Sequence, residues 1–91
     1  MYRVDAARSY VRRQLRRIPK QDLARIGEVV NALAEEPRPK GAIQLEQDVY
    51  RIRVGNYRII YKVYDEENLV LVGRVVRRSE STYDRLDELF D

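Results

Sequence analysis

The chain has 91 residues, which suits one compact domain, and its 44% apolar and 36% charged residues are typical of a folded protein in water. It contains no Cys and no His, which excludes disulfides, thiolate nucleophiles, His-centred catalysis and zinc sites built on those ligands. No apolar run approaches the roughly 20 residues needed to cross a bilayer, so we expect a cytoplasmic protein without membrane contact.

The net charge of +3 hides an uneven distribution along the chain. Residues 1–79 carry 17 Lys and Arg against 10 Asp and Glu, whereas residues 80–91 carry one Arg against five acids. Of the 18 basic residues, 15 are Arg. Because a guanidinium group binds phosphate through paired hydrogen bonds and stacks on bases, this composition favours a polyanionic partner such as a nucleic acid. A merely soluble, arginine-rich surface is the alternative.

The first half of the chain predicts one strand and two helices. Residues 2–5 have the pattern of a short strand. Apolar residues recur at helical spacing from Ala7 to Ile18, with arginines on the other faces, until Pro19 ends the pattern. A second helical stripe runs from Gln21 to about Glu36. We expect the two helices to form an antiparallel hairpin that buries its apolar stripes against another surface.

The second half of the chain predicts that surface. Val49–Val54 and Tyr57–Tyr64 are rich in β-branched and aromatic residues, which favours strands. Gly55-Asn56 between them is a two-residue hairpin signal. A third strand is expected at Leu69–Val76, after an acidic turn.

Residues 82–91 have the pattern of a short amphipathic helix. The predicted fold class is therefore α+β, with an N-terminal helical hairpin packed on a small antiparallel β-sheet and a short C-terminal helix. No linker or repeat divides the chain, so we expect a single domain over residues 1–91.

The predicted hairpin fixes which side chains share a face of the sheet. A two-residue turn places Arg53 opposite Arg58, and alternation then gives two faces. One face is apolar and holds Tyr50, Ile52, Val54, Tyr57, Ile59 and Tyr61; the other holds Arg51, Arg53, Arg58, Ile60 and Lys62. Two arginines directly opposite each other, about 5 Å apart, repel, which suggests a site for an anion. A solvated outer face with splayed charges is the alternative.

The third strand extends this basic face. With a three-residue turn, Arg74 falls beside Arg58, and Val70 and Val72 join Ile60 on the same face. Arg77 and Arg78 follow at the end of the strand. The side chains expected to face the helices are Leu69, Leu71 and Val75.

The segments Tyr50–Tyr61 and Val75–Glu80 together resemble the RelE/ParE superfamily of type II toxin–antitoxin toxins, and are most similar to its RelE branch. Leu15–Pro19 and Leu33–Gly41 resemble the helix ends and linker of the same family. The resemblance implies a RelE-like fold and a ribosome-dependent endonuclease that cleaves mRNA in the A site by attack of the 2′-OH, without metal or other cofactor. It also implies three partners: a cognate antitoxin, the ribosome and mRNA.

The resemblance assigns individual roles as well. Arg53 matches the position of the general base, Arg58 that of the arginine that binds the scissile phosphate, and Arg78 that of the general acid. Tyr83 is similar to the tyrosine that stacks on the substrate base. Because an arginine with a pKa above about 12 is a poor base, Arg53 either acts electrostatically or leaves proton removal to another group. The expected RNA- and ribosome-binding residues are Arg51, Lys62, Arg74 and Arg77.

Other interpretations remain open at this point. A ParE-type toxin, which inhibits DNA gyrase and performs no chemistry, shares the fold. An inactive family member or a general RNA-binding module is also compatible with the sequence. The arginines from Arg8 to Arg17 form either a solvated helix face or a contact with ribosomal RNA. We further hypothesise that residues 82–91 pack near the basic face and move when a partner binds.

Overall fold

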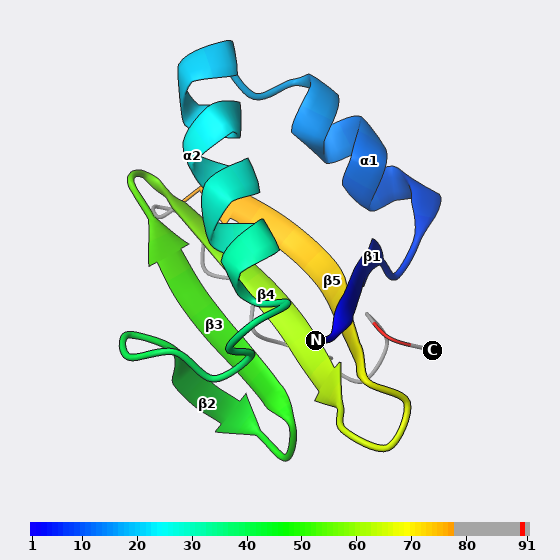
Figure 1. Cartoon of the computed structure of the whole chain (residues 1–91). Coiled ribbons are helices and arrows are strands. Elements are labelled where there is room, and N and C mark those ends of the chain that lie inside the picture. Colours follow the sequence, from blue (N-terminus) through cyan, green and yellow to red (C-terminus); the bar gives the residue numbers. More distant parts are fainter. Residues whose placement is uncertain (78–89, 91) are drawn as a thin grey trace.

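The computed structural model describes residues 1–77 and residue 90. Two helices and five strands follow one another along the chain (Figure 1). In order they are β1 (Arg3–Ala6), α1 (Ser9–Arg16), α2 (Lys20–Ala32), β2 (Ile43–Glu46), β3 (Val49–Val54), β4 (Tyr57–Tyr64) and β5 (Leu69–Arg77). Neither of these two helices is long and apolar enough to span a membrane.

The five strands form one sheet in the order β1-β5-β4-β3-β2. The pairs β2–β3, β3–β4 and β4–β5 are antiparallel, the last two as the sequence predicted, but β1 pairs with β5 in parallel. The prediction of a wholly antiparallel sheet was therefore wrong. A short turn forces two consecutive strands to be antiparallel, whereas two helices separate β1 from the rest of the sheet and leave its direction free.

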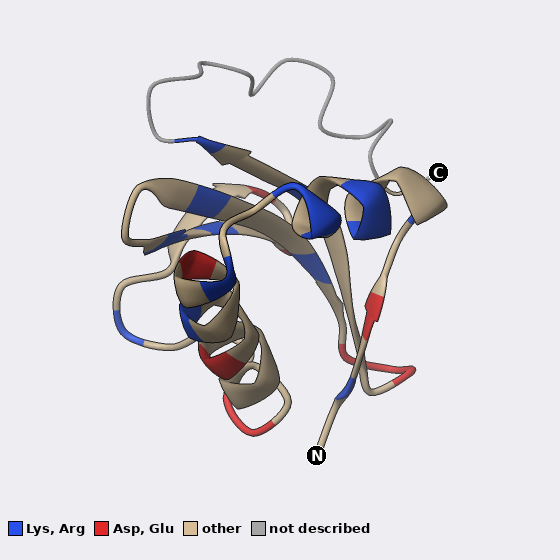
Figure 2. Cartoon of the chain, turned by 90° about the horizontal axis from the view of Figure 1, so that it is seen from above, with Lys and Arg blue, Asp and Glu red and all other residues tan. Residues whose placement is uncertain are grey.

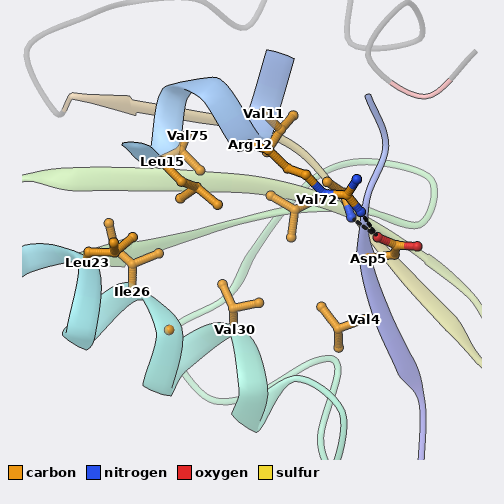
Figure 3. A pocket seen from close by; sticks show the side chains of 12 residues that line it. Val4, Asp5, Val11, Arg12, Leu15, Leu23, Ile26, Val30, Val72 and Val75 are labelled. Carbon is orange, nitrogen blue, oxygen red and sulfur yellow. Dashed lines mark hydrogen bonds and ion pairs between the residues drawn. The ribbon is translucent and has the colours of Figure 1, made fainter. Parts of the chain in front are cut away.

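Both helices lie over the same face of the sheet (Figure 1). α1 packs on β1 and β5, and α2 packs on β3. The predicted N-terminal helical hairpin is not confirmed, because the chain begins with β1 and the two helices rest on different strands. An apolar groove of about 240 Å³ remains between them, with Leu15 of α1 facing Leu23 and Ile26 of α2. An ion pair between Arg12 and Asp5 lies at its rim (Figure 3).

The core fills the space between the helices and the sheet. Val11 of α1 and Ile26 of α2 are buried against Ile59, Tyr61 and other strand residues of the same face. Tyr61 and Tyr50 stack with their ring centroids 5.8 Å apart. The helix-side face of the β3–β4 hairpin is therefore the apolar face that the sequence predicted.

The register of the β3–β4 hairpin is confirmed at each predicted pair. Arg53 lies opposite Arg58, and the pairs Val54–Tyr57, Ile52–Ile59 and Tyr50–Tyr61 follow. Gly55 begins the two-residue turn with a φ of 57°, a left-handed conformation that glycine adopts without a steric penalty.

The register of β5 changes at Gly73. Arg74 lies opposite Ile60 but Val72 lies opposite Tyr61, so Gly73 is an extra residue in β5, as in a β-bulge. Its carbonyl accepts a hydrogen bond from the Tyr10 hydroxyl at 3.0 Å. One inserted residue exchanges the two faces for the rest of the strand.

The residues of β5 that precede the bulge lie on the faces opposite to those predicted. Val70 and Val72 pack in the helix-side core, whereas Leu71 lies opposite Lys62 on the other face. The expectation for Val70, Val72, Leu69 and Leu71 was therefore wrong, because the β4–β5 turn spans the four residues 65–68 rather than three. Arg74 and Val75, which follow the bulge, lie on the predicted faces. Arg74 lies opposite Ile60, however, and not beside Arg58 as predicted.

Three further differences concern the limits of the elements. α2 ends at Ala32 rather than Glu36, and tighter turns continue to the proline-rich segment. The edge strand β2 was missed, although Ile43 and Leu45 alternate with polar residues there. The predicted helix at 82–91 lies outside the described residues, apart from residue 90, which is not in a helix.

Candidate functional site

The face of the sheet turned away from the helices carries five basic side chains. The register of β3, β4 and β5 places them together: Arg51, Arg53, Arg58, Lys62 and Arg74. We call this surface the arginine face. None of these three strands contains an acidic residue (Figure 2), whereas the edge strands of the sheet carry Asp5 in β1 and Glu46 in β2.

The arginines are arranged in two neighbouring rows across the strands. In one row Arg53 lies directly opposite Arg58. In the next row Arg51 and Arg74 lie on either side of Ile60, which is completely buried. Since directly opposed residues in a sheet are about 5 Å apart, this arrangement concentrates positive charge over a small area.

Three of these four arginine side chains are partly withdrawn from water, whereas Arg53 is exposed. The Nε atoms of Arg51, Arg58 and Arg74 are buried, and the side chains as a whole are half-buried. The Nε of Arg74 has no hydrogen-bond acceptor among the described residues. A buried donor without an acceptor is costly, and an anion that enters the site can supply the acceptor.

A hollow of about 380 Å³ lies beside the arginine face, where β3 meets β2 and the segment before it. Arg51 and Arg53 line it together with Lys40, Gly41 and Ile43. Its volume falls at the lower end of the range for small-ligand sites, roughly 300–1,000 Å³. Lys40 was not among the predicted site residues. The sequence feature that could have identified it is a basic residue in the proline-rich segment, shortly before β2.

A small apolar patch adjoins the arginines. Val49 and Ile60 are buried there, and Leu45 and Phe90 pack against them. Phe90 comes from the C-terminal end of the chain, so this residue covers part of the arginine face. We hypothesised that residues 82–91 pack near the basic face; of these residues the structure describes only Phe90, which makes the contact given above.

Arg38 ties the proline-rich segment to one end of the sheet. It donates hydrogen bonds to Asp65 at 2.8 and 3.1 Å and to the Tyr50 hydroxyl at 2.7 Å. Tyr2 donates to the same Asp65 carboxylate at 2.6 Å. These hydrogen bonds hold in place the segment that carries Lys40 at the hollow. The residues that form them lie far apart in sequence, so the sequence pattern did not predict the network.

The network also changes the ionisation of its members. Hydrogen bonds from Arg38 and from Tyr2 lower the pKa of Asp65 to about 2. Burial, and then the neighbouring Tyr50, raises the pKa of Tyr61, whose hydroxyl donates to the Pro37 carbonyl at 2.8 Å. Within residues 1–77 and 90, no group of three or more acidic side chains is placed to hold a metal ion.

A family model matches this chain over residues 4–82, and its description is the ParE toxin of the type II toxin–antitoxin system parDE. The chain belongs to the ParE toxin family. RelE1 of Methanocaldococcus jannaschii, which is named as an inferred toxin, is 26% identical over 73 residues, covering 75% of this chain and 81% of its own.

Solved RelE structures place the toxin in the RelE branch of the RelE/ParE superfamily. The RelE–RelB complex of Pyrococcus horikoshii OT3 matches with a TM-score of 0.76 and 28% identity, over 88% of this chain and 98% of that one. The RelBE2 complex of Mycobacterium tuberculosis matches with a TM-score of 0.73 and 29% identity, over 87% and 93% of the two chains. The isolated Escherichia coli RelE toxin, at 23% identity over 89% and 88%, has the same fold with a TM-score of 0.77.

The positions assigned by the family resemblance are distributed as follows. Arg53 and Arg58 face each other, and three of the predicted RNA-binding residues, Arg51, Lys62 and Arg74, share their face. Arg77 lies opposite Tyr57, a helix-side position, so the register turns it away from the other basic residues. Arg78 and Tyr83 lie outside the described residues. The Lys62 ammonium lies 5.2 Å from the centroid of the Tyr64 ring.

Proposed function

We propose that this toxin is a ribosome-dependent endoribonuclease that cleaves mRNA in the A site without a metal ion. The observation that carries the proposal is the pairing of Arg53 with Arg58, with Arg51 and Arg74 in the adjoining row. Four guanidinium groups on one surface suit a ligand with several phosphates. The resemblance to RelE toxins supports mRNA on the ribosome as that ligand.

The chemistry is an internal transfer within the RNA backbone. The 2′-oxygen attacks the adjacent phosphorus and loses its proton to a base, and the bond from phosphorus to the 5′-oxygen breaks. The departing 5′-oxygen takes up a proton, which leaves a 2′,3′-cyclic phosphate and a 5′-hydroxyl. Fixed cations lower the barrier because negative charge accumulates on the phosphoryl oxygens in the transition state.

Individual residues would divide this work. Arg58 would hold the scissile phosphate, and Arg53 would stabilise the developing charge rather than remove a proton. Arg51, Arg74 and Lys62 would bind the flanking phosphates, as phosphate contacts commonly fix the position of a nucleic acid. The family resemblance gives Arg78 the role of proton donor and Tyr83 that of a stacking platform. Both assignments remain predictions.

Cleavage of mRNA on programmed ribosomes tests the proposal. Purified toxin should cut ribosome-bound mRNA and leave the same RNA in free solution largely intact, and primer extension should show cuts in phase with codons. Arg58→Gln should lower the single-turnover rate by at least ~100-fold, the typical loss for one transition-state donor. Arg25→Gln removes the same charge from the exposed surface of α2 and should retain full activity. Full activity of the Arg58 variant would contradict the site.

We also propose that a cognate antitoxin holds the toxin inactive. The matching structures from P. horikoshii and M. tuberculosis are complexes of a toxin with its antitoxin. An acidic antitoxin segment on the arginine face would neutralise the site by direct ion pairing. A structure of the complex in which this face is uncovered would contradict that mode of inhibition.

Gyrase inhibition is the second candidate function. It is favoured by the description of the matching family model, which names the ParE toxin of parDE, and by Arg53, which cannot serve as a base. The same protein preparation can be assayed for DNA supercoiling by gyrase. Inhibition of supercoiling together with intact mRNA on programmed ribosomes would select this alternative.

A further inference from the structure

The hollow beside the arginine face is formed where the edge strand β2 stops short of its neighbour. β2 begins at Ile43, which pairs with Arg51, so the last residues of β3 extend past the end of β2. The loop that follows α2 reaches β2 at this edge of the sheet (Figure 1), and it brings Lys40 and Gly41 to the hollow. The volume of about 380 Å³ is sufficient for a small organic group.

Ile43 gives this hollow an apolar surface. Because Ile43 lies opposite Arg51 in the β2–β3 pair, its side chain belongs to the arginine face. The side chain is 48% exposed, and the only other large apolar side chain that is exposed among the described residues is Met1, at the start of the chain. Isoleucine is one of the residues that contact nucleobases directly in complexes with nucleic acids. An exposed isoleucine in a basic hollow therefore offers a surface on which a base can lie.

Three cations surround this apolar side chain. Lys40, Arg51 and Arg53 line the hollow with it, and none of the residues that line the hollow is acidic. Lys40 is exposed and forms no ion pair with another residue of the described chain. A nucleotide combines a flat, largely apolar base with a phosphate. The apolar side chain matches the first part, and the neighbouring cations match the second.

The loop that carries Lys40 is fixed by hydrogen bonds on both sides of this residue. On one side, Arg38 donates two hydrogen bonds to Asp65 at the end of the sheet. On the other side, the Ala42 N–H donates to the Pro39 carbonyl at 3.0 Å and closes a turn. A binding site whose residues are already in place loses less conformational entropy when its ligand binds. The hollow is therefore preformed rather than assembled by the ligand.

We infer that the hollow is a subsite for one nucleotide of the mRNA, next to the scissile phosphate. The base lies against Ile43, and Lys40 and Arg51 bind the phosphate of the same nucleotide. The place next to the scissile phosphate follows from Arg53, which lines the hollow and lies opposite Arg58. The inference rests on the proposed function, because it takes mRNA as the ligand. It adds Ile43 and Lys40 as residues that position the RNA and take no part in the chemistry.

The contact between Ile43 and a base is tested by removing each partner in turn. Cleavage on programmed ribosomes is measured with three mRNAs: the intact sequence, and two in which the nucleotide before or after the cut has an abasic ribose. On the intact mRNA, Ile43→Ser should lower kcat/KM about 10-fold, as expected for the loss of an apolar contact. On one of the two abasic mRNAs the same substitution should have no further effect, because the contact that it removes is already absent. Ile43→Val keeps most of the apolar surface and should stay within about two-fold of the wild type.

The contact between Lys40 and a phosphate is tested by its dependence on salt. Binding to programmed ribosomes is measured by co-sedimentation over a series of KCl concentrations. Lys40→Gln should lower the log–log salt slope by about one, as expected for one lost phosphate contact, and the loss of activity should appear in KM. The weakening should be the same for the intact and the abasic mRNAs, since the phosphate is present in all three. Lys20→Gln removes the same charge from the exposed start of α2 and should bind like the wild type.

The possible results separate the inference from its alternatives. No loss from Ile43→Ser on the intact mRNA, or an equal loss on all three mRNAs, would show that no base lies on this residue and would overturn the inference. Equal weakening by Lys40→Gln and Lys20→Gln would show an effect of net charge and overturn the phosphate contact. Thermal melting of every variant should match the wild type, because all three substituted residues are exposed. Failure of the proposed function is recognised separately: the wild-type toxin would leave mRNA on programmed ribosomes uncut, and this inference would fall with it.

Discussion

The two faces of the sheet come from the same strands but contain different chemistry. On the helix side, Ile59 and Tyr61 are completely buried beneath α1 and α2. On the reverse side, Arg51 and Arg74 flank Ile60, which is equally buried but belongs to a much smaller apolar cluster. Alternation along β4 therefore separates a face that stabilises the fold from a face that concentrates charge.

The comparison shows where this protein gives up stability. Half-buried guanidinium groups in adjacent rows repel one another and lose hydration, whereas apolar residues at the same positions would pack without either cost. Strain or repulsion that the rest of the structure must support is typical of functional sites. If this interpretation is right, substitutions on the helix side should change stability, and substitutions on the arginine face should change binding and activity.

The largest expected effect compares adjacent isoleucines of β4. Ile59 and Ile60 are both 0% exposed, but they point to opposite faces. Ile59→Ala should lower the free energy of unfolding by about 4 kcal/mol, and Ile60→Ala by about 2 kcal/mol, because the smaller cluster can close around the lost volume more easily. Urea denaturation followed by circular dichroism measures both values. Equal losses would show that the arginine face is packed as firmly as the core.

The next effect concerns the Tyr61 hydroxyl, a polar group inside the helix-side core. It donates to the Pro37 carbonyl at 2.8 Å, so Tyr61→Phe should cost about 1–2 kcal/mol by leaving that carbonyl without its partner. Tyr57 is the matched control, since it is also buried but its hydroxyl has no hydrogen-bond partner within the described part of the chain. Tyr57→Phe should leave stability nearly unchanged. A loss in both variants would point to altered ring packing instead.

A stabilising substitution is expected on the arginine face. Arg74→Met removes a buried Nε that has no acceptor within the described chain and keeps most of the aliphatic volume. The free energy of unfolding of the variant should be about 1 kcal/mol higher than that of the wild type, and the variant should bind programmed ribosomes more weakly. Lys62→Met also removes a charge from this face, but it loses the contact with the Tyr64 ring and should give no gain. A less stable Arg74 variant would contradict the idea that this face sacrifices stability for binding.

The sequence was sufficient to predict the arginine face where local chemistry sets the register. Gly55-Asn56 admits only a tight turn, and alternation then places Arg53 opposite Arg58. Across the β4–β5 turn the same reasoning failed, because the turn spans four residues rather than three, and the extra residue at Gly73 then returns the strand to the predicted faces. A glycine within a strand pattern was the available signal.

Other features depend on contacts between distant parts of the chain. Strand β1 was expected, but its parallel pairing with β5 is decided by how the helices cross the sheet. The hydrogen bonds of Arg38 join residues far apart in sequence, so no spacing rule predicts them. The roles of Arg78 and Tyr83 rest on the family resemblance alone. Both residues lie outside the described part of the chain, so these roles remain predictions.

The smallest expected effect concerns Asp65, at the end of the sheet, whose contribution to stability depends on pH. Among the described residues, the apolar helix-side core buries no charged side chain, whereas Asp65 accepts hydrogen bonds from Arg38 and Tyr2, and its pKa falls to about 2. A lowered folded-state pKa gives stabilisation that is present above the unfolded value, near 3.8, and is lost as the pH falls through about 2. Because Asp65 is exposed, the contribution is small.

The stability difference between wild type and Asp65→Asn measures this contribution. It should be constant at and above about pH 5 and should shrink between about pH 4 and pH 2, where the wild-type carboxylate becomes protonated in both states. Glu66→Gln makes the same change of charge in the same turn, but Glu66 forms no ion pair with the described residues, so its difference should stay near zero throughout. A difference for Asp65→Asn that persists below pH 2 would assign the effect to the geometry of the turn, because a protonated carboxyl no longer attracts Arg38.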